Sequence, residues 1–194
     1  MGRRTLDNIE RKILKQTIKL GALNGLDHIS TIEIAQKVGI SEGTIFVHFK
    51  TKENLIFESY KFCENIIKSK LIDMFNKAET MEELYDCWSG IVEVLVDKFN
   101  IATFLYNYFI SKYFVRFAFI ATDDIVNFIN KWLAKSGNSG KAPVKSAMAV
   151  WNNIYFGTLR YVIFEMNVDE NEKKLYLYHA FQTVNAPIFI KYKD

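Results

Sequence analysis

The chain has 194 residues, of which 49% are hydrophobic and 24% charged, a balance that suits a globular protein with a real core. Only nine Gly and two Pro occur, so long helices are favoured over many short strands joined by turns. No basic start followed by an apolar run marks a signal peptide, and the most apolar stretch, residues 101–121, is interrupted by Asn107, Lys112 and Arg116. A membrane span is therefore excluded, and we expect a cytoplasmic protein without a membrane partner.

The net charge of +3 comes entirely from the N-terminal quarter of the chain. Residues 1–53 hold nine Lys and Arg against six Asp and Glu, whereas residues 54–194 hold sixteen of each kind. This excess is a modest electrostatic footprint for a polyanionic partner, although chance alone could place three charges in the same way. Cys63 and Cys87 match no metal or redox spacing and are expected to be core residues, so neither a metal nor a cofactor is expected.

The first two helices are expected close to the N-terminus. Apolar residues recur at helical intervals over residues 6–23, ahead of an Asn-Gly pair that stops helices. Ser30 followed three residues later by Glu33 has the pattern of a capping box, which predicts a short helix over 30–38. Gly39 then suits the left-handed residue that a tight turn needs.

The remaining elements are also expected to be helices. Ser41 can cap a third short helix over 41–49, and Thr51 can start a long fourth one. Residues 136–140 form the clearest loop, and Pro187 is expected to end or kink the last helix. No segment has the alternation of a strand, so the sequence predicts an all-α fold. The later helices are expected over residues 80–99, 102–116, 122–135, 143–166 and 170–187.

Two short helices joined at Gly39, with a supporting helix ahead of them, form the pattern of a helix-turn-helix. In that motif the first short helix braces the second, which enters the major groove of DNA. Because short capped helices are common, the bare pattern is only moderately specific.

Residues 13–55 resemble the DNA-binding domain of the TetR family of transcriptional regulators. Residues 43–55, Gly-Thr-Ile-Phe-Val-His-Phe-Lys-Thr-Lys-Glu-Asn-Leu, closely follow the family pattern G-T-x-Y-x-H-F-x-x-K-E-x-L. The rest of the chain resembles the family only in its length and helical content. The resemblance implies a fold of about nine helices, with an N-terminal three-helix helix-turn-helix domain over 1–53. It assigns a larger effector-binding and dimerisation domain to residues 54–194.

Two residues depart from the family pattern. Phe46 stands where the family usually has Tyr, so a hydroxyl that would contact a DNA phosphate is missing. Gly21 stands where a core Phe is usual, which is expected to loosen the first helix or to let Phe49 or Leu26 fill the space. Neither departure changes the resemblance.

The resemblance also implies which residues meet DNA. Glu42 is equally interpreted as a solvated carboxylate at a helix start, and His48 as a structural histidine under the turn. Phosphate contacts, including those at two helix N-termini, are implied for Ser30, Thr31, Ser41, Thr44, His48 and Lys52. The resemblance implies that the residues that read base edges are Glu42, Gly43, Thr44 and Val47.

By resemblance, the last two helices, about 143–190, form a homodimer interface. An isologous dimer would place two recognition helices about one DNA turn (~34 Å) apart on a pseudo-palindromic operator. Trp151, Tyr155, Leu159 and Val162 on one helix, and Leu177, Phe181 and Val184 on the other, give the apolar stripes expected at that interface.

An aromatic-rich segment offers a second candidate site. Its side chains either pack as core or enclose an apolar cavity for an unknown small-molecule effector. The candidate ligand-binding residues are Phe104, Tyr108, Phe109, Tyr113, Phe117, Trp151 and Tyr155.

The sequence therefore predicts a dimeric repressor that a small apolar or amphipathic ligand releases from its operator. The alternative is a helix-turn-helix regulator that has no small-molecule ligand and is controlled by a protein partner, which a filled core would favour. Only three His occur, without paired carboxylates, metal spacing or a nucleophile motif. No catalytic residue is assigned, and we do not expect an enzyme.

Overall fold

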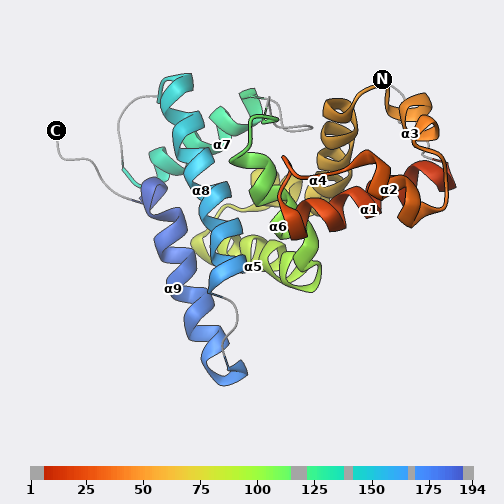
Figure 1. The fold of residues 1–194 in the computed structure, drawn as a ribbon. Helices are drawn as coiled ribbons and strands as arrows, with labels where there is room; N and C mark the ends of the chain where they lie inside the picture. The colour runs from red at the N-terminus through yellow and green to blue at the C-terminus, as the bar shows by residue number, and fades with distance from the viewer. Residues whose placement is uncertain (1–6, 115–121, 138–141, 166–168, 190–194) are drawn as a thin grey trace. The chain divides into compact units, whose positions relative to one another are not determined.

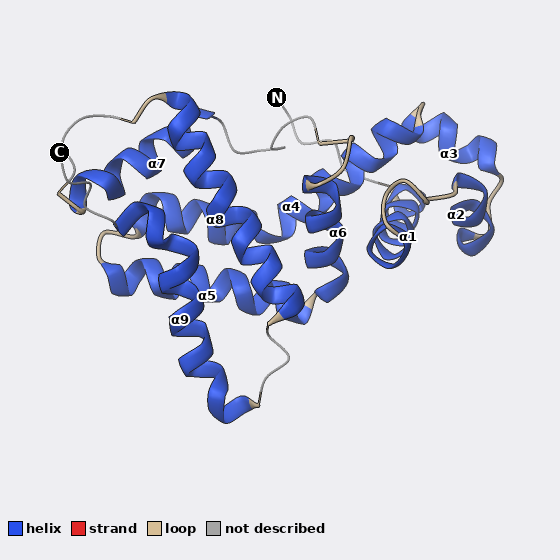
Figure 2. Ribbon diagram, turned by 60° about the vertical axis from the view of Figure 1, so that its left-hand side comes forward, coloured by secondary structure: helices blue, strands red, loops and turns tan. Residues whose placement is uncertain are grey.

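A computed structural model describes residues 7–114, 122–137, 142–165 and 169–189. In these ranges the regular elements are all helices, so the predicted all-α class is confirmed (Figures 1 and 2). No helix of the described ranges is long and apolar enough to cross a membrane. The helices are α1 (Asn8–Asn24), α2 (Thr31–Val38), α3 (Glu42–Phe49), α4 (Lys52–Lys77), α5 (Met81–Asp97), α6 (Phe99–Phe109), α7 (Thr122–Lys135), α8 (Val144–Phe164) and α9 (Glu170–Phe189).

The chain divides into two compact units. The first comprises residues 1–66 and 100–118, which brings α1 to α3, the start of α4 and nearly all of α6 together. The second comprises residues 67–99 and 119–194. The helix-turn-helix therefore shares its unit with α6, a helix that follows it by about fifty residues in the sequence.

The helix α1 begins with a capping box that was not predicted from the sequence. The Asp7 side chain accepts a hydrogen bond from the backbone N–H of Glu10 at 2.6 Å, and the Glu10 carboxylate accepts from the Asp7 N–H at 3.2 Å. Two of the N–H groups that every helix start leaves unpaired are satisfied in this way. The helix accordingly begins at Asn8, two residues after the expected position.

The capping box predicted for α2 is half present. Ser30 accepts from the Glu33 N–H at 3.3 Å, as expected of an N-cap. The Glu33 carboxylate instead lies 3.7 Å from Nζ of Lys37, one turn further along the same helix.

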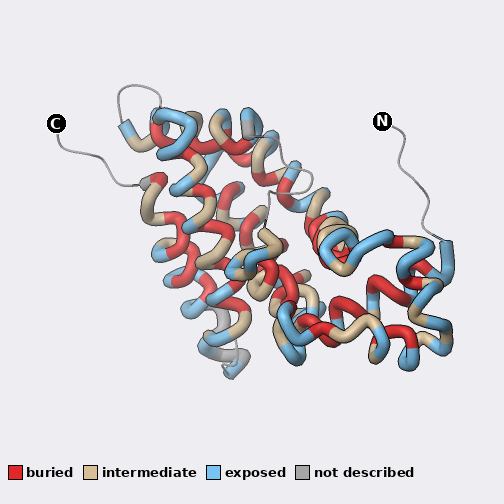
Figure 3. The backbone as a smooth tube through the Cα atoms, turned by 45° about the horizontal axis from the view of Figure 1, so that its top comes forward, coloured by how far each residue is buried: buried red, intermediate tan, exposed pale blue. Residues whose placement is uncertain are grey.

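The predicted tight turn is present at Gly39, which has φ 77° and ψ 39° and donates its N–H to the last turn of α2. This left-handed conformation favours glycine because it has no Cβ. The helices on either side of the turn pack through Ile34 and Ile45, which are 0% and 1% exposed. Burial on one side of each helix is visible along the trace in Figure 3.

The space at Gly21 is filled by a residue that the sequence did not indicate. A Cβ at Gly21 would lie 2.8 Å from two ring carbons of Phe104 and 2.9 Å from a methyl carbon of Leu26. Nδ2 of Asn107 donates to the Gly21 carbonyl at 2.9 Å. Of the two residues expected to fill this space, Phe49 and Leu26, Leu26 is among the nearest neighbours, together with Phe104 of α6, and α6 thereby packs against α1.

The second unit has an aromatic core. The indole N–H of Trp88 donates to Oγ1 of Thr158 at 3.0 Å, and this hydroxyl in turn donates to the Ile154 carbonyl at 2.8 Å. These bonds satisfy polar groups that would be costly to bury alone. The capping box predicted at the start of α5 is confirmed, since Thr80 and Glu83 each accept the other's backbone N–H.

Three helix boundaries differ from the expected ones. The helix expected over 102–116 is α6, which runs from Phe99 to Phe109. Pro143 is the N-cap of α8 rather than a residue of its first turn. Pro187 does not end α9 at once, because the helix continues to Phe189. A proline this close to a helix end removes only one late intrahelical hydrogen bond.

Candidate nucleic-acid interface

The helix α3 has one buried side and one exposed side. Ile45 and Phe49 are 1% and 3% exposed and anchor it in the first unit. Gly43 is exposed, Thr44 is half-buried and Val47 is 68% exposed. An exposed strip of small and apolar groups next to the turn is the arrangement that a recognition helix needs in a DNA groove.

Two of the candidate DNA-contacting residues bond to each other across the turn. Oγ1 of Thr31, the first residue of α2, donates to Oε1 of Glu42, the first residue of α3, at 2.5 Å. This bond joins the starts of the two helices and holds the Glu42 carboxylate in one orientation. The sequence had suggested that the Glu42 carboxylate either reads a base or is solvated, whereas in the structure it accepts a hydrogen bond from Thr31.

A second pair lies at the start of α3. The Ser41 hydroxyl oxygen accepts from the Thr44 N–H at 3.2 Å and lies 2.9 Å from the Thr44 hydroxyl. Ser41 is therefore the N-cap that the sequence predicted. The two hydroxyls are held together at an end of the helix where the backbone N–H groups favour an anion.

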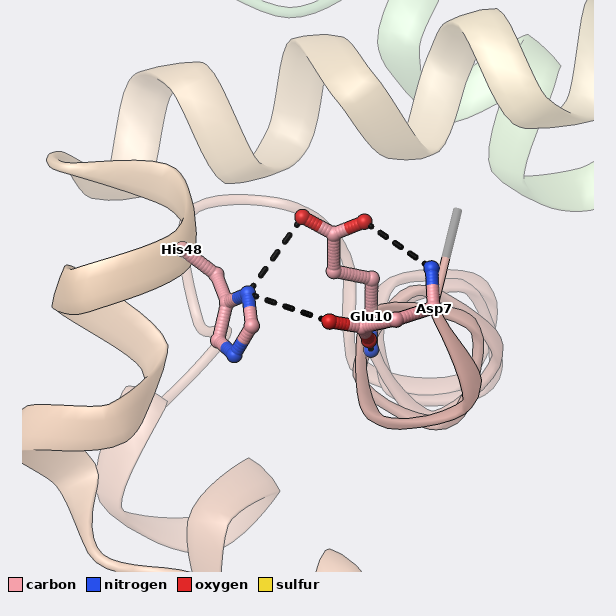
Figure 4. A group of neighbouring side chains, drawn as sticks. All are labelled: Asp7, Glu10 and His48. Carbon is pink, nitrogen blue, oxygen red and sulfur yellow. Dashed lines mark hydrogen bonds and ion pairs between the residues drawn. The ribbon is translucent and has the colours of Figure 1, made fainter. Parts of the chain in front are cut away.

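His48 lies beside two carboxylates from α1. Its Nδ1 is 3.3 Å from Oε1 of Glu10 and 3.9 Å from Oδ2 of Asp7. Figure 4 shows that both carboxylates approach the same ring nitrogen, while the other ring nitrogen points away from them. Three side chains of this kind could also hold a metal ion. If His48 has the structural role that the sequence also allowed, Glu10 is the residue that it contacts.

The turn between α3 and α4 carries two lysines. Lys50 has φ 66°, a left-handed conformation that costs energy for a residue with a side chain, and its Nζ donates to the Val47 carbonyl at 3.1 Å. Nζ of Lys52 donates to the Asp27 carbonyl at 3.4 Å. The Lys112 ammonium, 2.9 Å from Oδ1 of Asp27, lowers the pKa of that carboxyl below its ordinary value of 3.8.

Asp7, Glu10 and Lys50 were not predicted as site residues from the sequence. The first two were detectable, because an Asp followed three residues later by Glu has the capping-box pattern ahead of an apolar run. Their contact with His48 was not detectable, because 38 residues separate Glu10 from it. Nothing in the residue type of Lys50 indicates a positive φ.

The candidate ligand-binding residues fall into two groups. In the first unit, Phe104 and Tyr108 are buried, and Tyr108 stacks on Tyr60 with ring centroids 4.0 Å apart. Phe109 and Tyr113 are half-buried in the same unit, and Phe117 lies outside the described residues. Trp151 and Tyr155 belong to the second unit.

Trp151 and Tyr155 line a small apolar cavity between α4, α5 and α8. Its volume is about 20 Å³, and Trp88 and Met74 also line it. A volume of this size has room for about one water molecule. The cavity in this conformation is too small for an apolar effector.

The stripes expected at a subunit interface lie inside the subunit. Trp151, Leu159 and Val162 of α8 are 1–2% exposed, and Phe181 of α9 is 1% exposed. They pack within the core because a single chain already covers both helices on that side. The prediction that these side chains face a second copy was therefore wrong.

Other apolar side chains of α8 and α9 remain exposed. A groove of about 550 Å³ runs between the two helices, lined by Gly157, Arg160 and Tyr161 of α8 and by Tyr176 and Val184 of α9, among others. Among the described side chains of these two helices, the large apolar residues that are exposed are Val144, Phe164, Leu175, Tyr176 and Tyr178.

Comparison with known proteins identifies the N-terminal segment. Residues 13–58 match the family described as bacterial regulatory proteins, tetR family. The uncharacterized HTH-type transcriptional regulator YerO of Bacillus subtilis (strain 168) is 35% identical over 74 residues, which are 38% of this chain. The chain matches only 23% of that relative's length.

Solved structures share the fold over most of the chain. A TetR-like transcriptional regulator from Rhodococcus sp. RHA1 has a TM-score of 0.65 at 14% identity, with 94% of this chain and 98% of that one covered. AmtR of Mycobacterium smegmatis has a TM-score of 0.61 at 14% identity, with 95% and 90% covered. A regulator from Aquifex aeolicus VF5 has 0.59 at 19%, with 93% and 98% covered. At these identities the likeness concerns the fold.

An all-helical fold that begins with a helix-turn-helix is the architecture that this chain shares with the solved TetR-like regulators. The match to the tetR family lies in the DNA-binding segment, residues 13–58, and over the rest of the chain the likeness to TetR-like regulators is one of fold.

Proposed function

We propose that the protein is a dimeric repressor that binds a pseudo-palindromic operator through α3 and is released from it by a small apolar or amphipathic ligand. The observation that carries the DNA-binding part is the two-sided α3, which is anchored by Ile45 and Phe49 and presents Val47 outward. The proposed domain division, 1–53 for DNA and 54–194 for effector and dimer, belongs to the same proposal.

Contacts within the protein support the proposed contacts with DNA. The hydroxyls of Ser41 and Thr44 and the side chains of Thr31 and Glu42 are already oriented by their mutual hydrogen bonds. A side chain that is ordered before binding loses less conformational entropy when DNA arrives. We assign phosphate contacts to Ser30, Thr31, Ser41, Thr44, His48 and Lys52, and base contacts to Glu42, Gly43, Thr44 and Val47.

The dimer is assigned to α8 and α9 because exposed apolar side chains gather on these two helices. Phe164 is 61% exposed and Leu175 is 62% exposed. Apolar side chains that remain exposed close together mark a protein contact surface in many proteins. Gly157 brings the two helices close within one subunit, since its Cβ position lies 3.4 Å from Val184.

The ligand is assigned to the cavity beside Trp151 and Tyr155, which a ligand must enlarge. The effector would bind a conformation in which α4, α5 and α8 are further apart and would shift the population towards it. The same helix α4 begins at Lys52, a proposed phosphate contact, and later carries Leu71 and Met74 on the cavity wall. A displacement of α4 would therefore alter the DNA contact as well.

The small cavity also favours the second candidate function. A regulator without a small-molecule ligand, controlled by a protein partner, needs no internal volume, and about 20 Å³ is what a well-packed core leaves. Thermal shift and operator-binding titrations against apolar ligands distinguish the two. A ligand that raises the melting temperature and weakens operator binding supports the first candidate, whereas a ligand that binds without weakening it supports the second.

Selection of bound DNA from a random pool tests the central proposal. We expect a motif of two inverted half-sites, and Val47→Ala is expected to weaken binding by about tenfold, since it removes roughly two methyl groups from the contact. Leu23→Ala is the matched control, because Leu23 is 76% exposed on α1 and has no assigned contact. Failure of the wild-type protein to enrich any sequence would overturn DNA recognition.

Sedimentation of the protein with and without operator tests the dimer. We expect a dimer that Leu175→Glu converts to monomer, because it places a charge among the exposed apolar side chains of α9. Glu172→Lys, at an exposed position of the same helix, is the control for a charge change alone. A monomer in the wild-type protein at operator-binding concentrations would refute the assignment.

A further inference from the structure

A carboxylate stands at the start of α3, the helix that we propose enters the DNA groove. Glu42 is the first residue of this helix and is half-buried, and its Oε1 accepts a hydrogen bond from the Thr31 hydroxyl at 2.5 Å. Thr31 is the first residue of α2, which packs against α3. The bond therefore connects the two helix starts at which the proposed DNA contacts gather.

The bond decides what the Thr31 side chain can do at a DNA surface. A threonine hydroxyl has a single hydrogen to donate, and here Glu42 receives it. The oxygen that remains can only accept, and a phosphate diester has no hydrogen to offer it. The phosphate contact assigned to Thr31 therefore falls to its backbone N–H, since the first N–H groups of a helix have no partner within that helix.

The charge of Glu42 restricts what its carboxylate can meet on DNA. A carboxylate only accepts hydrogen bonds, and phosphate oxygens repel it. In the major groove guanine and thymine present acceptor atoms, whereas cytosine and adenine present an amino group that donates. Adenine also places its N7 acceptor beside that amino group, which repels a carboxylate. Cytosine is therefore the base whose groove edge suits Glu42.

We propose that Glu42 reads a cytosine in each half-site and that Thr31 is the positioning residue that orients its carboxylate. This inference rests on the proposed function, because it requires α3 to lie in the major groove. In a helix-turn-helix the N-terminal residues of the recognition helix reach the base edges, and Glu42 is the first of them. Oε1 is bonded to Thr31, and Oε2 accepts from the cytosine amino group.

The test measures base preference at one position of the operator. The wild-type motif is first selected from a random pool, and its cytosine is then replaced in one half-site by each of the other bases. Thr31→Val and Thr31→Ala remove the hydroxyl but keep the backbone N–H, whereas Thr31→Ser keeps both. Glu42→Gln removes the charge, and Glu53→Gln is its control, at an exposed position in the first turn of α4.

For the wild-type protein we expect about tenfold weaker binding when thymine or guanine replaces the cytosine. Glu42→Gln should prefer adenine instead, because a carboxamide donates to N7 and accepts from the N6 amino group. Thr31→Val and Thr31→Ala should lower the cytosine preference to about twofold, while operators without this cytosine bind as they do to the wild type. Thr31→Ser and Glu53→Gln should keep the full preference. In a Glu42→Ala background, Thr31→Val should have no further effect, because Thr31 acts through Glu42.

Three results would overturn the inference. If the loss of the Thr31 hydroxyl weakens binding equally on every operator, the hydroxyl contacts a phosphate and does not position Glu42. If the selected motif has no cytosine in common, or if Glu42→Gln keeps the cytosine preference, Glu42 does not read this base. In both cases DNA recognition by the protein stands. If the wild-type protein selects no DNA, the proposed function fails and this inference fails with it.

Discussion

Gly21→Ala offers a direct measure of how closely α6 packs against α1. In the interior of an exposed helix this change stabilises by about 1 kcal/mol, because alanine has the higher helix propensity. Here the new Cβ would lie 2.8 Å from two ring carbons of Phe104, which is 0% exposed. Overpacking of this kind costs about 1–3 kcal/mol, so we expect a net loss of about 1 kcal/mol in the free energy of unfolding.

A double-mutant cycle with Phe104→Val isolates the contact, because valine ends before the two ring carbons. The valine variant alone should cost about 2–4 kcal/mol through the cavity it leaves. In its background Gly21→Ala should stabilise by about 1 kcal/mol, which gives a coupling of about 2 kcal/mol by urea denaturation. Gly90→Ala in α5 is the control, since its Cβ would meet only the flexible end of Lys70. Additive effects, within about 0.5 kcal/mol, would refute the close packing.

Three further predictions concern single positions. Gly39→Ala is expected to lower the free energy of unfolding by about 1 kcal/mol, because the φ of 77° at this position is strained for a residue with a Cβ. Gly43→Ala is the control, since a Cβ has room there, and it should not destabilise the protein. Equal melting temperatures of the two variants would contradict this prediction. Thr80→Ala should cost about 1 kcal/mol through loss of the α5 cap, and Thr80→Ser should restore it in the same denaturation assay. Burial raises the pKa of the Cys63 thiol well above its ordinary value of 9.0, so Cys63 should resist a thiol reagent in the folded protein and Cys87 should react first. The Cys63 thiol ionises near pH 9.0 only in the unfolded chain, so its burial stabilises the folded protein fully below that pH and less as the pH rises above it. A free energy of unfolding that does not change with pH above 9.0 would contradict the raised pKa.

The sequence by itself determined the helix-turn-helix, because local rules specify its parts. Ser30, Gly39 and Ser41 occupy an N-cap, a left-handed turn and a second N-cap, as predicted. Each depends on the chemistry of one residue and on backbone groups within four positions of it, so a single sequence is sufficient. The all-α class followed from the same local patterns.

Only the tertiary structure decided which distant residues complete the site. Phe104 fills the space at Gly21, and Asn107 bonds to the Gly21 carbonyl across 86 residues of sequence. Glu10 meets His48 because the packing of α1 on α2 and of α2 on α3 brings the two side chains together, and no spacing rule joins these two residues. Periodicity indicates which side of a helix is buried, but the partner that covers it depends on packing between helices. For the same reason the apolar stripes of α8 and α9 were identified correctly as buried and assigned to the wrong neighbour.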